Sequence, residues 1–261
     1  MDDRTALANA VEAIVREAGD MALARWTTGF ARWDKAPGNP VSEVDLAVDA
    51  LLRERLIALL PDAGWLSEET ADSPDRLARE RVWVVDPIDG TRDYLRARPG
   101  WAVSVALVEA GRPVIGVLHA PARGELWRAA SGLGAMRNGM RLTASDRTVL
   151  AGARIPADVL PRVDRDLIAV AKPNGIALRI AMVAAGEADL LTTRRWGQEW
   201  DIAAAVLIAS EAGAIVSDGR GRELAFNQAN PRAWGVLACA PGLHAAALAR
   251  FVAADADGLP A

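Results

Sequence analysis

The apolar positions in the first sixty residues predict two amphipathic helices. From Thr5 to Trp26 apolar side chains recur every three or four residues, which is the spacing of one buried helix face. The same spacing returns from residue 44 to residue 59, and Pro61 ends this second helix. The segment 29–40 between the helices contains several prolines and glycines, so we expect a loop there.

The middle of the chain carries the pattern of a sheet. Residues 64–67 predict a short strand, and the β-branched run 82–85 predicts a strand buried on both faces. We expect pairing to stop at Asp86, because Pro87 cannot donate a ladder hydrogen bond. Strand-like segments follow at 102–108, 113–119, 125–129 and 135–142, and together they suggest an antiparallel sheet.

Near residue 143 the pattern changes to alternating strands and helices. Strand-like runs occur at 167–171, 188–192, 214–217 and 236–240, and helical runs at 176–185, 200–212 and 244–254. Such alternation favours an α/β arrangement. We therefore expect two parts: an N-terminal α+β half, residues 1–145, with the antiparallel sheet, and a C-terminal α/β half, residues 146–261.

Composition narrows the class of protein. With 261 residues, 51% of them hydrophobic, the chain can bury a sizeable core in one large domain or two smaller ones. The net charge of −4 gives no electrostatic case for binding a nucleic-acid polymer or an anionic membrane. A single cysteine excludes an intrachain disulfide, and two histidines disfavour a zinc site. No signal peptide and no apolar run of roughly 18 residues is found, so we expect a cytoplasmic protein.

The candidate chemistry is concentrated at residues 83–91, which read Trp-Val-Val-Asp-Pro-Ile-Asp-Gly-Thr. Here a predicted buried strand delivers Asp86, the Ile88 carbonyl, Asp89 and the Gly90-Thr91 turn to one point. Asp-Pro and Asp-Gly are also ordinary turn dipeptides. The combination of both is more specific, since Mg²⁺ prefers carboxylate and carbonyl oxygens. Free amides at a helix N-terminus suit a phosphate.

Three further acidic residues have two interpretations each. Asp45 follows Ser42 in a capping-box pattern at the start of the second helix. Glu68 begins an acidic pair that could simply face solvent. Asp201 precedes an apolar helix and could be its N-cap. For Asp45 and Asp201 the capping and functional roles can coexist.

The nonapeptide 83–91 resembles the signature of the inositol monophosphatase superfamily, the Mg²⁺-dependent and Li⁺-sensitive phosphatases. Three more matches occur in the order of that superfamily, at residues 42–45, 66–69 and 200–205. The resemblance extends from the first helix to about residue 239. It implies a layered αβαβα sandwich and a metal-dependent phosphomonoesterase.

The resemblance also assigns site residues. It implies two Mg²⁺ ions, with a third and weaker one near Glu68, held by Glu68, Asp86, the Ile88 carbonyl, Asp89 and Asp201. The implied catalytic residues are Thr91, Asp45 and Glu68, with Thr91 oriented by Asp45 to activate the attacking water. The implied phosphate and substrate contacts are Asp89, Gly90, Thr91 and Asp201.

Within the superfamily, residues 66–69, 89–94 and 103–121, the last with its segment 116–121, look closer to the CysQ-type 3′(2′),5′-bisphosphate nucleotidases. Inositol-hydrolysing members of the animal type carry a hydroxyl-binding glutamate seven residues before the aspartate matched by Asp201, and this chain has Arg194 there. We therefore expect Arg194 to bind the second phosphate of 3′-phosphoadenosine 5′-phosphate. The alternatives are an inositol-1-monophosphatase and a pseudo-phosphatase that binds a protein partner. A monomer or a homodimer is expected.

Overall fold

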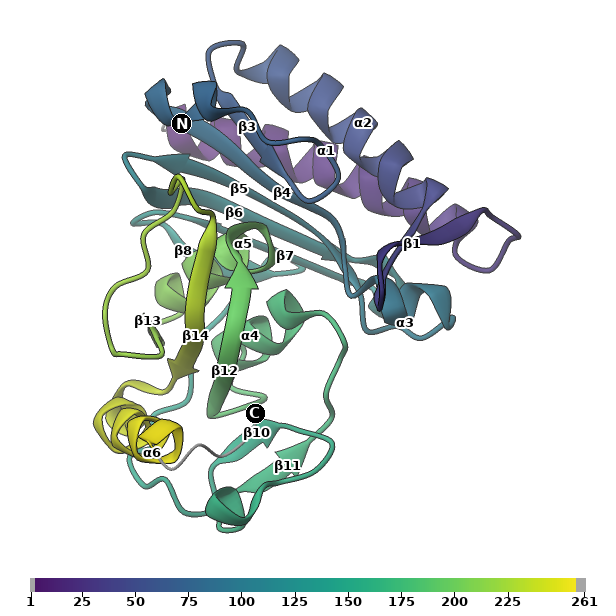
Figure 1. The fold of residues 1–261 in the computed structure, drawn as a ribbon. Helices are drawn as coiled ribbons and strands as arrows, with labels where there is room; N and C mark the ends of the chain where they lie inside the picture. Colours follow the sequence, from purple (N-terminus) through teal and green to yellow (C-terminus); the bar gives the residue numbers. More distant parts are fainter. Residues whose placement is uncertain (1–2, 257–261) are drawn as a thin grey trace.

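Helices and sheets alternate in five layers (Figure 1). The computed structural model describes residues 3–256. Two helices form the first layer, two the third and one the fifth: α1 (Asp3–Arg25), α2 (Glu43–Leu59), α4 (Ile176–Ala184), α5 (Glu199–Glu211) and α6 (His244–Ala256). None of the helices within the described residues combines the length and apolar character needed to cross a membrane. The expected αβαβα sandwich is confirmed.

The second layer is a seven-stranded sheet whose strands follow one another in chain order. Its first pair is parallel and all later pairs are antiparallel. The strands are β3 (Gly64–Ser67), β4 (Arg81–Asp89), β5 (Ala102–Glu109), β6 (Arg112–Ala120), β7 (Glu125–Ala130), β8 (Gly134–Arg137) and β9 (Met140–Arg141).

Both faces of this sheet are covered, which explains the continuous apolar runs in the sequence. Val85 and Val103 pack in the core formed with α1 and α2. Val84 and Ala106 belong to the other core, shared with α4 and α5. The sheet therefore holds its strand ends rigidly between helical layers.

Two expectations for the N-terminal half are wrong. The predicted loop at 29–40 contains the hairpin of β1 (Arg32–Ala36) and β2 (Asn39–Ser42). All residues of β1 are exposed, so it lacks the apolar alternation that marks a strand. Pairing of β4 also resumes after Asp86, with Asp89 opposite Ala102. Pro87 lies within the register shift between them, where no ladder hydrogen bond is required of it.

The C-terminal sheet has the order β12 (Leu190–Gln198), β14 (Arg232–Cys239), β13 (Ile215–Asp218), and both pairings are antiparallel. Strand β10 (Arg154–Pro156), which the sequence does not predict, pairs in parallel with β11 (Ile168–Val170). Helices α4 and α5 pack against both the large and the small sheet. The division of the chain at residue 145 therefore stays a prediction.

A glycine in β6 allows the closest approach of α5 to the large sheet. A Cβ atom on Gly116 would lie 2.6 Å from the carbonyl oxygen of Ala204. Gly116→Ala is expected to lower the free energy of unfolding by about 1–3 kcal/mol, because the helix backbone must shift. Urea denaturation measures this loss, with Gly29→Ala as the control, since no atom lies within 4 Å of a Cβ at Gly29. Equal stability of both variants would contradict the close contact.

Candidate active site

The end of β4 supplies two buried carboxylates. Asp86 and Asp89 lie on this strand with only 1% and 6% of their surface exposed. The Oδ1 atom of Asp86 accepts a hydrogen bond of 3.0 Å from the amide of Ile88. The ladder between β4 and β5 is interrupted between the two aspartates. Both carboxylates therefore lie at an irregular strand end, and such an irregularity changes the direction of the side chains.

Glycine is required at position 90, where β4 ends and α3 (Thr91–Leu95) begins. Gly90 has a φ of +96°, in the left-handed region that favours glycine. A Cβ atom there would lie 2.6 Å from the Gly100 carbonyl oxygen and 2.9 Å from the Gly175 amide nitrogen. Three chain segments thus pack backbone against backbone beside Thr91.

Three carboxylates from distant parts of the chain meet at this strand end. Glu68, Asp86 and Asp201 each offer an oxygen atom, and these atoms lie within 4.8 Å of one another. Glu68 directly follows β3, whereas Asp201 lies in the first turn of α5. Two carboxylates about 4 Å apart repel each other by about 4 kcal/mol at an effective dielectric constant of about 20. The cluster therefore needs a cation or bound protons to be stable.

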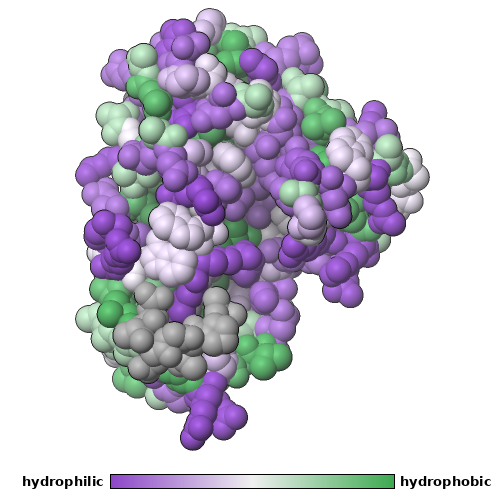
Figure 2. Space-filling view, viewed as in Figure 1, coloured by the Kyte–Doolittle hydropathy of each residue, from purple (hydrophilic) through white to green (hydrophobic). Residues whose placement is uncertain are grey.

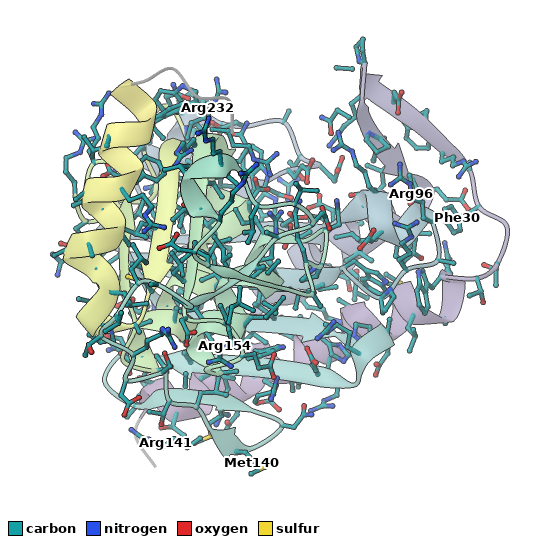
Figure 3. The ribbon with its side chains drawn as sticks, turned by 90° about the horizontal axis from the view of Figure 1, so that it is seen from below. Phe30, Arg96, Met140, Arg141, Arg154 and Arg232 are labelled. Atoms are coloured by element: carbon teal, nitrogen blue, oxygen red, sulfur yellow. The ribbon has the colours of Figure 1, made fainter. Side chains whose placement is uncertain are left out.

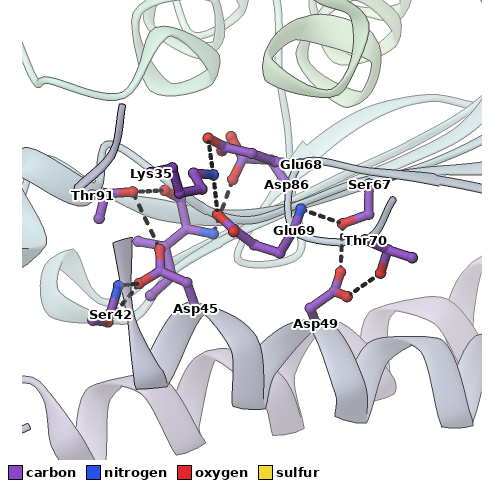
Figure 4. Close-up of polar contacts among 11 residues, drawn as sticks. Lys35, Ser42, Asp45, Asp49, Ser67, Glu68, Glu69, Thr70, Asp86 and Thr91 are labelled. Carbon is purple, nitrogen blue, oxygen red and sulfur yellow. Dashed lines mark hydrogen bonds and ion pairs between the residues drawn. The ribbon is translucent and has the colours of Figure 1, made fainter. Parts of the chain in front are cut away.

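The turn that carries Glu68 is held from α2. The hydroxyls of Ser67 and Thr70 both donate to the buried carboxylate of Asp49 (Figure 4). These two donors flank Glu68 and Glu69 along the chain. Asp49 therefore positions both glutamates without touching them directly.

Lys35 places a positive charge beside the same turn. Its ammonium nitrogen lies 3.0 Å from Oε1 of Glu68 and 2.7 Å from Oε1 of Glu69 (Figure 4). Burial raises the pKa of Glu69 to about 7, although the hydrogen bond from Lys35 acts in the opposite direction. Sequence reasoning does not predict this contact, because a lysine on an exposed hairpin carries no local signal of its partner.

The Thr91 hydroxyl faces Asp45 of α2. Its oxygen lies 3.2 Å from Oδ1 of Asp45 and 3.0 Å from the Ile88 carbonyl oxygen, and either can accept the proton (Figure 4). The other carboxylate oxygen of Asp45 accepts from the amide and hydroxyl of Ser42, which caps α2. Both interpretations of Asp45 are therefore compatible with one arrangement.

Asp89 also anchors the start of α4. Its carboxylate accepts hydrogen bonds of 3.1 Å from the Ile176 amide and 2.7 Å from the Ala177 amide. The N-cap residue of α4 is Gly175, which has no side chain to accept these bonds. A carboxylate has about four acceptor sites. Asp89 can therefore cap this helix and still bind a cation.

One cleft of about 200 Å³ collects these groups. Its walls include most of the residues predicted for the metal and phosphate: Glu68, Asp86, Ile88, Asp89, Gly90, Thr91 and Asp201. In Figure 2 the surface between the β1–β2 hairpin and the C-terminal strands is hollowed and mostly hydrophilic. A larger cavity of about 410 Å³ lies beyond α3 and contains none of the clustered carboxylates.

Comparison with known proteins agrees with this arrangement. The model of the inositol monophosphatase family matches residues 3–255. The chain belongs to the inositol monophosphatase family. Over 226 residues it is 30% identical to the fructose-1,6-bisphosphatase/inositol-1-monophosphatase of Thermotoga maritima, covering 80% of this chain and 84% of the relative. Over 230 residues it is 32% identical to the 3′(2′),5′-bisphosphate nucleotidase CysQ of Escherichia coli, covering 82% and 91%.

A solved structure shows the same fold. The IMPase of Thermotoga maritima superposes with a TM-score of 0.82 at 27% identity, covering 94% of this chain and 96% of that chain. This inositol monophosphatase family member is therefore a phosphatase. Relatives at nearly equal identity include an inositol-1-monophosphatase and a 3′(2′),5′-bisphosphate nucleotidase.

The donor set of this family member fits a divalent cation. Burial, with the charges of Glu68 and Asp89, raises the pKa of Asp86 well above its usual range. Burial, with the charges of Asp89 and Glu68, raises the pKa of Asp201 to about 8. A cation among these oxygens would remove this electrostatic penalty. Carboxylate and carbonyl oxygens are the ligands that Mg²⁺ takes in proteins.

Arg194 lies away from the cleft, contrary to expectation. Its guanidinium carbon lies 5.5 Å from the centre of the Phe251 ring, on the side of the small sheet that carries α6. Neighbouring residues of a strand point to opposite faces. Arg195 therefore lines the cleft in place of Arg194.

Arg179 is a site residue that sequence reasoning misses. It is the one charged residue of α4, is 9% exposed, and lines the cleft. Its guanidinium donates to the carbonyl oxygens of Gly175 and Asn174, which fixes its direction. An arginine within an otherwise apolar helix is an unusual pattern, and this signal could have pointed to it.

Proposed function

We propose that this phosphatase is a Mg²⁺-dependent 3′(2′),5′-bisphosphate nucleotidase, which hydrolyses 3′-phosphoadenosine 5′-phosphate to AMP and phosphate. The observation that carries the proposal is the pair of arginines, Arg179 and Arg195, on the wall of the carboxylate cleft. The resemblance of residues 66–69 and 89–94 to the CysQ-type branch supports it.

The family resemblance assigns the metal ligands, and three of them, Glu68, Asp86 and Asp201, lie in the carboxylate cluster. Glu68, Asp86 and the Ile88 carbonyl would hold one Mg²⁺, and Asp86, Asp89 and Asp201 a second. Two bound ions stabilise negative charge on the attacking and leaving oxygens of an in-line displacement. The resemblance also implies a third, weaker ion held by Glu68, whose carboxylate contacts Lys35 in this structure.

Thr91 and Asp45 would move the proton of the attacking water. Thr91 can donate its own proton to Asp45, which leaves its oxygen able to accept a hydrogen bond from water. Burial raises the pKa of Asp45, and this makes its carboxylate a better proton acceptor. The water oxygen forms a bond to phosphorus as the bond to the ribose 3′-oxygen breaks, and that oxygen takes up a proton. The amides of Gly90 and Thr91 would hold the transferred phosphate.

The two arginines would bind the second phosphate. Arg179 is fixed by its bonds to the loop before α4, and Arg195 is exposed with no ion-pair partner among the described residues. Arginine forms bidentate, charge-assisted hydrogen bonds with phosphate oxygens. The 5′-phosphate of a bisphosphate nucleotide provides such a group, whereas inositol 1-phosphate has none.

Two alternative functions would require different features of the site. An inositol-1-monophosphatase would need an acceptor for ring hydroxyls, and the position of the expected glutamate holds Arg194 instead. A pseudo-phosphatase that binds a protein partner would need none of the clustered carboxylates. Their convergence within 4.8 Å favours an enzyme.

A substrate panel decides between these functions. We expect the highest kcat/KM for 3′-phosphoadenosine 5′-phosphate, compared with fructose 1,6-bisphosphate, adenosine 3′-monophosphate and inositol 1-phosphate in a phosphate-release assay. Arg195→Gln should lower kcat/KM for the bisphosphate by about tenfold or more, because a charged hydrogen bond is lost. It should have little effect on adenosine 3′-monophosphate, which lacks the second phosphate.

The neighbouring variant Arg194→Gln is the matched control, since it removes the same charge on the side facing Phe251. It should leave the ratio between bisphosphate and monophosphate unchanged. A higher kcat/KM for inositol 1-phosphate than for the nucleotide would refute the nucleotidase proposal and support the inositol alternative.

A further inference from the structure

A second cavity, of about 410 Å³, lies on the far side of α3 from the carboxylate cleft. We propose that it binds a small multivalent anion, such as a phosphorylated metabolite, separately from the substrate. Its volume falls within the usual range for small-molecule sites. The charges on its walls favour an anion as the ligand.

Basic side chains dominate the lining. Four of the lining residues are cationic, namely Arg96, Arg98, Arg123 and Lys172, and two are acidic, Asp93 and Asp158. The difference of four and two leaves a net charge of +2 on the walls. In a protein with an overall charge of −4, this cavity is a local exception that attracts anions.

Two of these cations are unpaired. Lys172 lies 2.7 Å from Asp158, and Arg123 lies 2.9 Å from Glu125. The guanidinium groups of Arg96 and Arg98 have no hydrogen-bond or ion-pair partner among residues 3–256. Their donors are therefore available to the planar, bidentate contacts that arginine makes with phosphate.

The end of α3 brings these two arginines to the same cavity. The Arg98 amide donates to the Asp93 carbonyl at 2.9 Å, and the Ala97 amide donates to the Tyr94 carbonyl at 3.1 Å. This is a Schellman turn, with Ala97 in the left-handed conformation at a φ of +53°. The turn reverses the chain between Arg96 and Arg98, and Figure 3 shows Arg96 on the side of the molecule that carries Phe30.

The cavity is also connected to the catalytic cleft. Asn174 lines both, and its amide donates to the Asp93 carboxylate at 3.2 Å. The next amide, of Gly175, donates to the Gly100 carbonyl at 2.8 Å. The two amides after that donate to Asp89 in the cleft. An anion held by Lys172 and Arg98 would therefore stabilise the segment 172–177 that holds Asp89.

Binding of inorganic pyrophosphate to the metal-free protein tests the site. In EDTA the clustered carboxylates of the catalytic cleft oppose binding of an anion beside them, and the variant Arg195→Gln reports any binding at the arginines of that cleft. Isothermal titration calorimetry should detect one site in the full chain. The double variant Arg96→Gln/Arg98→Gln should weaken binding by about tenfold or more, because charge-assisted bonds are lost.

Two control variants test whether pyrophosphate binds at this cavity. Arg53→Gln/Arg55→Gln removes the same charge from exposed positions on α2 and should leave binding unchanged. Arg195→Gln, in the cleft, should also leave it unchanged. Loss of binding in Arg195→Gln, or unchanged binding in Arg96→Gln/Arg98→Gln, would overturn the proposal. So would a dimer in sedimentation that only Arg96→Gln/Arg98→Gln disrupts, since a second copy would then occupy the cavity.

Hydrogen exchange tests the connection to the cleft. Pyrophosphate should slow amide exchange at residues 174–177 in the wild-type chain and not in Arg96→Gln/Arg98→Gln. Unchanged exchange in the wild type at saturating pyrophosphate would rule out the connection. Neither measurement depends on turnover, so failure here leaves the nucleotidase proposal standing.

Discussion

Asp86→Asn is expected to abolish phosphate release while it stabilises the metal-free protein. Loss of turnover should exceed about 100-fold, because even residues that only support a metal ligand typically cost 10–100-fold. Stability should rise because Asp86 is 1% exposed and its charge opposes those of Glu68 and Asp201. Asparagine retains an acceptor for the Ile88 amide, so the local turn is kept.

The measurement combines a phosphate-release assay with melting temperatures in EDTA at pH 8. Asp75→Asn makes the same chemical change at an exposed position of η1 (Pro74–Ala78) and should alter neither value. The gain from Asp86→Asn should appear as a higher melting temperature in EDTA, because asparagine places no charge in this buried position. A destabilised Asp86→Asn protein, or one with near-normal turnover, would show that Asp86 is not part of a repulsive metal-binding cluster.

Removal of metal should make stability fall as the pH rises from about 4 to about 8. Burial is the main cause that raises the pKa of Asp89 to about 6, and it raises that of Asp201 to about 8, from an ordinary value of 3.8. Between these values the folded protein retains protons that the unfolded chain has released. Each rise in pH through that window therefore favours the unfolded chain, and the stability gained from the bound protons is lost above pH 8.

Mg²⁺ should reverse this trend, since it binds the ionised cluster. At 100 times its dissociation constant, a ligand specific for the folded state adds about 2.7 kcal/mol. Melting temperatures from pH 5 to pH 8, in EDTA and in Mg²⁺, measure both effects. Burial also raises the pKa of Glu199 to about 7, but Glu199 accepts from two backbone amides outside the cluster. Glu199 contributes equally to stability in EDTA and in Mg²⁺. The difference in melting temperature between the two buffers therefore measures the effect of the carboxylate cluster.

Asp201→Asn provides the control for the pH profile. It should flatten the decline in EDTA between pH 6 and pH 8 and reduce the stabilisation by Mg²⁺. Parallel profiles in EDTA and Mg²⁺ for the wild-type chain would be incompatible with metal binding at these carboxylates.

The sequence predicts site residues best where a short local pattern fixes the position of the side chain. The buried run before Asp86 predicts a strand that ends in carboxylates, and the structure places Asp86 and Asp89 there. The helix-capping pattern places Asp45 at the start of α2, within reach of Thr91. In both cases a short-range pattern positions the side chain, so no knowledge of distant partners is needed.

Predictions fail where position depends on long-range pairing. A register shift in the pairing of β12 with β14 falls between Thr193 and Trp196, so the two arginines lie where the ladder is irregular and where a sequence pattern does not show which of them faces the cleft. Lys35 reaches Glu68 only because an exposed hairpin folds over the end of the sheet. The order of the small sheet is likewise set by pairing between strands that are distant along the chain. None of these three arrangements can be predicted from the spacing of apolar residues along the chain.

The position of Asp201 has a consequence for synthesis of the chain. Glu68 and Asp86 lie in the first third of the sequence, whereas Asp201 is synthesised later, as part of α5. Helix α5 covers one face of the large sheet. A nascent chain that has not yet produced α5 exposes the apolar residues Val84, Ala106 and Leu118 and lacks a complete metal site. Such surfaces are prone to aggregate. Growing chains would therefore expose this apolar surface until late in translation, and only the Mg²⁺ site that includes Asp201 would be incomplete until then.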